Sequence, residues 1–107
     1  MSVITSAAPY LSLLDEQDPS LKVYALQSLN TQVDQLWSEI ANRITDIEQL
    51  FEDVQFTHRE LAALVASKVY YNLGDYDSAV KYSLLAGDSF NTQEDSEFVE
   101  TIVSKCL

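Results

Sequence analysis

Residues 66–87, ASKVYYNLGDYDSAVKYSLLAG, decide the fold of this chain. The first half of this stretch continues an apolar pattern at helical spacing and stops at Gly74, the residue type that most readily adopts the left-handed conformation ending a helix. Asp75 follows directly and can cap a second helix, because its carboxylate can accept hydrogen bonds from free backbone amides. The second helix should stop at Gly87. Two helices joined by so short a connection form an antiparallel hairpin.

This hairpin resembles a tetratricopeptide repeat, a helix pair of about 34 residues. Ser67 is small where the two helices must approach, and Tyr70 should fill the groove between them. Residues 57–90 are therefore expected to be the best-defined hairpin, and residues 91–107 the first helix of a following repeat. The expected repeat positions are Ser67, Tyr70, Gly74, Ala79 and Ala86.

The residues before the hairpin also have a helical pattern. Asp18-Pro19 is a cap followed by proline at the first helical position, where the missing N–H costs nothing. From residue 21 to residue 50, apolar side chains recur every three or four positions, which is the period of a helix and not the alternation of a strand. The pattern predicts one long helix or two helices in series, with breaks expected near Asn30 and Asn42.

Further local signals lie near both ends of the chain. Residues 3–14 are apolar at helical spacing, with Pro9 marking an early first turn. Thr57 and Glu60 have the spacing of a capping box, in which a threonine oxygen and a glutamate each satisfy a free amide at a helix start. Asn91 or Thr92 can cap a last helix. The residues of that helix expected to face inward are Phe98, Ile102 and Val103.

The expected fold class is therefore all-α, with antiparallel hairpins stacked as a tetratricopeptide-like superhelical rod. Residues 1–107 should form one amino-terminal helical-repeat domain, because a chain of 107 residues has room for one small core. With two glycines and two prolines, it has few turn residues for a many-stranded sheet. The apolar terminus, residues 102–107, indicates a piece of a longer protein.

The charge of the chain disfavours several classes of partner. A total of 17 acidic and 6 basic residues gives a formal net charge of −11, which repels the phosphates of nucleic acids and anionic membrane surfaces. No apolar run approaches the roughly 20 residues that span a bilayer, and the first residues lack the basic start of a leader peptide. The single cysteine, Cys106, cannot form an internal disulfide. These features favour a reducing, intracellular compartment.

No group of residues in the sequence has the pattern of a catalytic or metal site. Cys106 and His58 are the only thiol and imidazole, and a working pair also needs close geometry and a third orienting group. Acidic runs such as Asp15-Glu16 lack the glycine and the alternating ligands of a calcium loop. One cysteine and one histidine are too few for a zinc site. We expect no catalytic residue, metal, cofactor or small-molecule substrate.

Aromatic residues give a weaker indication about partners. Trp37, Tyr70 and Tyr76 fall at core-facing spacings, so we expect them to pack inside. Tyr71 and Tyr82 are the more open positions, and an exposed aromatic often anchors a protein interface. The pattern does not identify the partner-binding residues.

Three stretches together resemble a known family. They are similar, in order, to the start of the largest non-ATPase base subunit of the 26S proteasome regulatory particle, and the similarity begins near the initiating methionine with ITSAA at residues 4–8. The resemblance identifies the chain as an amino-terminal fragment of such a scaffold subunit. The stretches are VDQLWSEIA (33–41), RELAALVASKVYYNLGDYDSAVKYSLLAGDSF (59–90) and FVETIVSKC (98–106).

The resemblance implies a non-catalytic scaffold. In that family this region begins a helical rod, which is followed by a solenoid of proteasome/cyclosome repeats and a receptor-binding tail. It implies contacts with other base and lid subunits, a part in ATP-dependent degradation of ubiquitinated proteins, and a location in the cytoplasm and nucleus. The alternative is a free-standing tetratricopeptide-like adaptor that binds a basic or apolar peptide. An enzyme has no supporting motif in this sequence.

Overall fold

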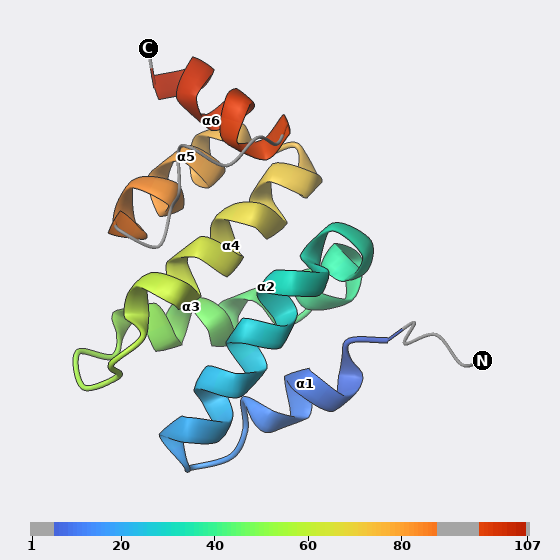
Figure 1. The fold of residues 1–107 in the computed structure, drawn as a ribbon, viewed down its shortest axis with the longest axis vertical. Helices are drawn as coiled ribbons and strands as arrows, with labels where there is room; N and C mark the ends of the chain where they lie inside the picture. The colour runs from blue at the N-terminus through green and yellow to red at the C-terminus, as the bar shows by residue number, and fades with distance from the viewer. Residues whose placement is uncertain (1–5, 88–96, 107) are drawn as a thin grey trace.

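The computed structural model describes residues 6–87 and 97–106, and every regular element in these segments is a helix (Figure 1). The all-α fold predicted from the sequence is confirmed. The expected cap at Asn91 or Thr92, and residues 3–5 of the first apolar pattern, lie outside the described segments. The helices are α1 (Ala8–Leu13), α2 (Pro19–Ala41), α3 (Ile44–Glu52), α4 (Arg59–Leu73), α5 (Tyr76–Leu85) and α6 (Glu97–Cys106).

The helices follow one another from one end of the molecule to the other, with α4 near the centre (Figure 1). α4 packs against α2, α3 and α5, whereas α1 packs against α2, and α6 packs against α5. This central position explains the sequence of α4, in which residues 62–67 are all buried in succession. A helix covered on most sides has little need of a polar face, because few of its side chains meet water.

The core is built from aliphatic side chains that these helices direct toward one another. Its largest fully buried members include Leu26 and Leu29 of α2, Ile47 of α3 and Val65 of α4. Burying one such side chain contributes roughly 1.5–3 kcal/mol relative to leaving it in water. The core therefore extends across α2, α3 and α4. Because α4 also packs against α5, the core holds the hairpin of α4 and α5 in place.

The start of α2 is as the sequence predicts. One carboxylate oxygen of Asp18 accepts from the Ser20 amide at 2.9 Å, and Pro19 occupies the first turn. This cap satisfies one of the free amides at the helix start.

The break expected near Asn30 is wrong, because α2 continues through it as a single helix. Leu26, Leu29 and Val33 are buried on both sides of this position. Their packing outweighs the low helix propensity of one asparagine. The break expected at Asn42 is confirmed, since α2 ends there and α3 begins two residues later.

The capping box expected at Thr57 and Glu60 is wrong. The N-cap of α4 is His58, whose side chain makes no capping bond, and the Thr57 hydroxyl lies 2.9 Å from the His58 ring nitrogen. Arg59 holds this helix start, because its Nε donates to a main-chain carbonyl of α3 at 2.5 Å. Glu60 does not reach back, since its carboxylate lies beside Gly87 after the end of α5.

In α6 the expected burial of Phe98 and Ile102 is confirmed, but Val103 is 40% exposed and that expectation is wrong. Val99 is buried in its place. α6 packs on α5, and the Phe98 ring meets the Tyr71 ring of α4 edge-on. The described neighbours cover α6 from one side, so its buried stripe is narrower than its apolar one.

Candidate functional site

Ser67 and Ala79 mark a close contact between the two helices of the hairpin. Both residues are fully buried, and the Ser67 hydroxyl donates to the Ala79 carbonyl oxygen at 2.6 Å. A bond from so short a side chain to the main chain of the other helix requires the two backbones to lie close together. Neither position therefore has room for a larger side chain. Ala86, just after the end of α5, is also fully buried.

The turn between α4 and α5 is centred on Gly74, whose φ of 84° lies in the left-handed region. The amides of Gly74 and Asp75 donate to the carbonyls of Tyr71 and Tyr70, which closes the last turn of α4. Asp75 then caps α5 as predicted, because its carboxylate accepts from the amide and the hydroxyl of Ser78. The sharp turn thus depends on Gly74, which adopts the left-handed φ, and on Asp75, which caps α5.

Tyr70 and Tyr82 form a cluster with Glu48 of α3, which we call the Glu48–tyrosine cluster. The two rings stack with centroids 5.7 Å apart and 6° between their planes, and both hydroxyls donate to Oε2 of Glu48. Burial, together with the bond to Glu48, raises the pKa of Tyr70 to about 12 and also raises the pKa of Tyr82. Both phenols therefore stay protonated at neutral pH and act as donors. One carboxylate in this way links α3 to α4 and α5.

The burial expected for two tyrosines is reversed in the structure. Tyr82, expected to be open, is 7% exposed, and Tyr76, expected in the core, is 39% exposed. Tyr82 turns inward because Glu48 supplies an acceptor for its hydroxyl. Tyr76 lies in the first turn of α5, where its ring meets the Tyr71 ring and the Lys105 ammonium group. Hydrogen bonding and position along the helix, rather than apolar spacing, decided both outcomes.

Sequence reasoning also missed Glu48 itself. One signal was present in the sequence, because Glu48 follows Ile44, a member of the apolar pattern, by four positions and so shares a helix face with it. An acid on such a face must find donors if it is to be covered. Trp37, expected inside, is half-buried and packs against the core.

The described residues hold no group of three or more histidine, cysteine, aspartate or glutamate side chains arranged to bind a metal ion. None of the described helices combines the length and the hydropathy needed to cross a bilayer. His58 is exposed at the start of α4, with its ring bonded to Thr57. The side chain of Cys106 lies outside the described part of the chain, so the proposed absence of a thiol–imidazole pair stays a prediction.

Arg43, in the turn between α2 and α3, joins two carboxylates. Its guanidinium contacts Asp15, in the connection from α1 to α2, at 2.6 Å, and its Nε donates to Asp46 of α3. The bond to Asp46, with help from Asp15, raises the pKa of Arg43 above its ordinary value. The cluster is partly exposed, so each pair contributes no more than about 1 kcal/mol. Arg43 thus positions the connection between α1 and α2 against α3.

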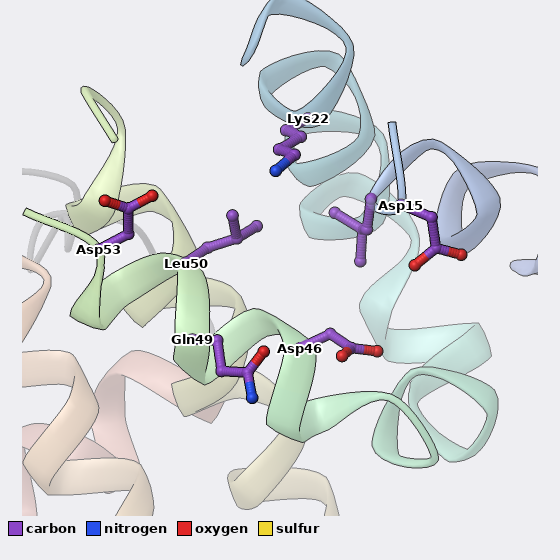
Figure 2. A pocket seen from close by; sticks show the side chains of 7 residues that line it. Asp15, Lys22, Asp46, Gln49, Leu50 and Asp53 are labelled. Carbon is purple, nitrogen blue, oxygen red and sulfur yellow. The ribbon is translucent and has the colours of Figure 1, made fainter. Parts of the chain in front are cut away.

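A groove opens between the start of α2 and the end of α3, and we call it the Lys22–Asp53 groove because these two residues line both of its halves. Figure 2 shows Lys22 and Leu50 pointing into the opening, with Asp46 on α3 and Asp53 just after the end of that helix. The half beside Asp46 has a volume of about 300 Å³. The other half, which reaches Phe56, has a volume of about 240 Å³.

The comparison with known proteins gives the family. The sequence matches the family described as 26S proteasome subunit RPN2, N-terminal domain, over residues 5–107. The chain belongs to this family. The family predicted from the three sequence stretches is confirmed.

Named relatives of the RPN2 family are similar along almost the whole chain. The "26S proteasome regulatory subunit RPN2" of Saccharomyces cerevisiae is 62% identical over 104 residues, covering 97% of this chain and 11% of the relative. The "26S proteasome non-ATPase regulatory subunit 1" of Drosophila melanogaster is 49% identical over 104 residues, covering 97% of this chain and 10% of the relative. The "26S proteasome non-ATPase regulatory subunit 1 homolog B" of Arabidopsis thaliana is 44% identical over 108 residues, covering 99% of this chain and 11% of the relative. The chain therefore spans about a tenth of the length of the curated relatives that it matches.

Proposed function

We propose that the chain is a non-catalytic scaffold segment of the base of the proteasome regulatory particle, contributing to subunit assembly in the ATP-dependent degradation of ubiquitinated proteins. The observation that carries this proposal is the match of residues 5–107 to the N-terminal domain of a 26S proteasome subunit. The relatives are named as regulatory or non-ATPase regulatory subunits. We therefore assign to this chain a supporting role that is separate from ATP hydrolysis.

The bonding of polar side chains to one another within the chain supports this proposal. In the Glu48–tyrosine cluster, one carboxylate accepts from two hydroxyls of the same chain. Arg43 is held between Asp15 and Asp46. An active site needs a nucleophile, base or stabilising donor left available to a substrate. Here the bonded polar groups join one helix to another, as a structural role requires.

The partners that we propose are other base and lid subunits of the regulatory particle, in the cytoplasm and nucleus. The mechanism is shape, because stacked helix pairs present a stiff surface to neighbours and surface charge helps to select them. In this proposal residues 57–90 form one repeat and residues 91–107 begin the next. The positions that hold the repeat together are Ser67, Tyr70, Gly74, Ala79 and Ala86.

The test is native affinity purification of the full-length parent subunit, tagged at its carboxyl end, followed by mass spectrometry of the proteins that co-purify. We expect proteasomal ATPases and lid subunits in near-stoichiometric amounts, and none in a purification from cells without the tag. Recovery of the parent alone, or with one unrelated protein, would contradict the proposal. The adaptor alternative would then be tested by measuring whether the isolated chain binds basic or apolar peptides.

A further inference from the structure

A chain of contacts among three aromatic rings, with a lysine at each end, joins α6 to the hairpin of α4 and α5. The Phe98 ring of α6 meets the Tyr71 ring of α4 with centroids 5.4 Å apart, and Tyr71 meets Tyr76 of α5 at 5.9 Å. Lys68 Nζ of α4 lies 5.8 Å from the centroid of Phe98. Lys105 Nζ of α6 lies 5.4 Å from the centroid of Tyr76. We call these five residues the lysine–aromatic joint.

The two lysine contacts of this joint run in opposite directions. Lys68 reaches from the hairpin to a ring of α6, and Lys105 reaches from α6 to a ring of the hairpin. Both ammonium groups lie within the roughly 6 Å at which the face of an aromatic ring attracts a cation. Neither lysine forms an ion pair with a carboxylate of residues 6–87 or 97–106. Two of the six basic residues of the chain therefore contact rings across this one joint.

The joint has an apolar part that is buried and a charged part that is accessible. Phe98, Val99 and Ile102 of α6 are each less than a tenth exposed, and their burial holds the helix in place. Lys105 is exposed, and the Tyr76 ring beneath it is 39% exposed. α6 lies at one end of the molecule, beside α5 (Figure 1). The contact of Lys105 with Tyr76 can therefore be changed chemically from outside without opening the core.

We propose that Lys105 is a charge-dependent clamp on α6 and that acetylation of its side-chain amine loosens this helix from the hairpin. In that reaction the amine, after losing one proton to water, attacks the carbonyl carbon of an acetyl thioester. A C–N bond forms as the C–S bond breaks, and the leaving thiolate takes up the proton that the nitrogen then loses. The amide product carries no charge, so it lacks the attraction of the ammonium group to the Tyr76 ring. This inference goes beyond the proposed function and does not depend on it.

The test introduces acetyllysine at position 105 of the full-length parent subunit through the genetic code and measures amide hydrogen exchange by mass spectrometry. Exchange reports local opening of each helix, so a weaker clamp shows as faster exchange in α6. We expect the amides of α6 to exchange about two- to fivefold faster than in the unmodified subunit, as for the loss of one exposed cation–ring contact. The amides of α2 and α4 should not change, because their burial does not involve Lys105.

Lys81 provides a matched control. It is also exposed, and its Nζ lies 5.4 Å from the centroid of Tyr82, but that ring belongs to the next residue of the same helix. Acetyllysine at position 81 therefore changes the net charge equally without removing a contact between helices, and exchange in α6 should stay as in the unmodified subunit. Lys105→Arg keeps a cation that can face the ring and should also leave exchange unchanged. In a Tyr76→Leu background, acetyllysine at position 105 should add no further acceleration, because the ring is gone.

Three results would overturn the clamp. Unchanged exchange in α6 on acetylation at position 105 would show that the charge of Lys105 does not hold the helix. Equal acceleration by acetyllysine at positions 105 and 81 would assign the effect to net charge and not to the contact with Tyr76. Full acceleration in the Tyr76→Leu background would show that Lys105 acts on another group. The co-purification of the parent with proteasome subunits has no bearing on any of these results.

Discussion

At the scale of single residues, Ala79 limits how closely α4 and α5 approach. It is fully buried, and its carbonyl accepts from Ser67 at 2.6 Å. We expect Ala79→Leu to lower the free energy of unfolding by about 1–3 kcal/mol, because an overpacked contact forces shifts in backbone and rotamers. Urea denaturation followed by circular dichroism measures this loss, with Ala8→Leu at an exposed position of α1 as the control. An unchanged midpoint for Ala79→Leu would show that the two helices are paired differently.

Gly74 acts through its backbone conformation. Its φ of 84° is strained for a residue with a Cβ, so we expect Gly74→Ala to lower the free energy of unfolding by about 1–2 kcal/mol. Gly74→Asn should cost less, because asparagine tolerates the left-handed region better than alanine does. The same urea experiment compares the two variants. Since no atom lies within 4 Å of a Cβ built at Gly74, equal losses would contradict the assignment of the effect to the left-handed φ.

At the scale of helices, the Glu48–tyrosine cluster joins α3 to α4 and α5. Glu48→Ala would leave the Tyr70 and Tyr82 hydroxyls without their acceptor, so we expect a loss of about 1–3 kcal/mol in the free energy of unfolding. A double-mutant cycle of Glu48→Ala with Tyr82→Phe should give a coupling of roughly 0.5–1.5 kcal/mol. Strictly additive losses would contradict a direct bond between these side chains.

The same cluster makes stability depend on pH in the alkaline range. The pKa of Tyr70 is about 12 in the folded chain, against an ordinary value of 10.0, because burial and Glu48 favour its neutral form. The unfolded chain therefore loses this proton first as the pH rises, so the stabilisation is complete below pH 10 and declines toward pH 12. We expect the decline, measured by urea midpoints at increasing pH, to be shallower in Tyr70→Phe. Tyr24→Phe, an exposed tyrosine, should match the unchanged chain.

The helices differ in how far the sequence alone could predict them. Asp18 and Asp75 cap the helices that they precede through bonds to residues two or three positions away, so the local pattern was enough. The bond from Tyr82 to Glu48 spans 34 positions, and no local pattern carries that information. Asn30 was misread for a related reason, because burial of α2 against α4 outweighed a local helix breaker.

The groove shows the same limit at the candidate site. Lys22 lies in α2, and Asp53 follows the end of α3. Only the packing of α2 and α3 against α4 places the two residues on facing walls of the groove. Nothing in the sequence pattern singles out the three acids of this surface or Lys22. A surface formed by two segments far apart in the chain therefore becomes visible only once the topology is known.

At the scale of the whole molecule, charge repulsion opposes compactness. The chain carries a net charge of −11, while the ion pairs within the described residues are those of Arg43 with Asp15 and Asp46. The longest extent is 39 Å. At 10 mM salt the screening length is about 30 Å, so acids across the molecule repel one another, whereas at 150 mM it is about 8 Å and only neighbours interact.

We therefore expect the urea midpoint of unfolding to rise when sodium chloride is increased from about 10 to about 150 mM, because screening removes more repulsion than attraction. Asp34→Lys, at an exposed position in the middle of α2, replaces a negative charge by a positive one. This variant should have a higher midpoint at low salt and a weaker dependence of the midpoint on salt. A midpoint that falls as salt is added would mean that the few attractive contacts around Arg43 outweigh the surplus of acids.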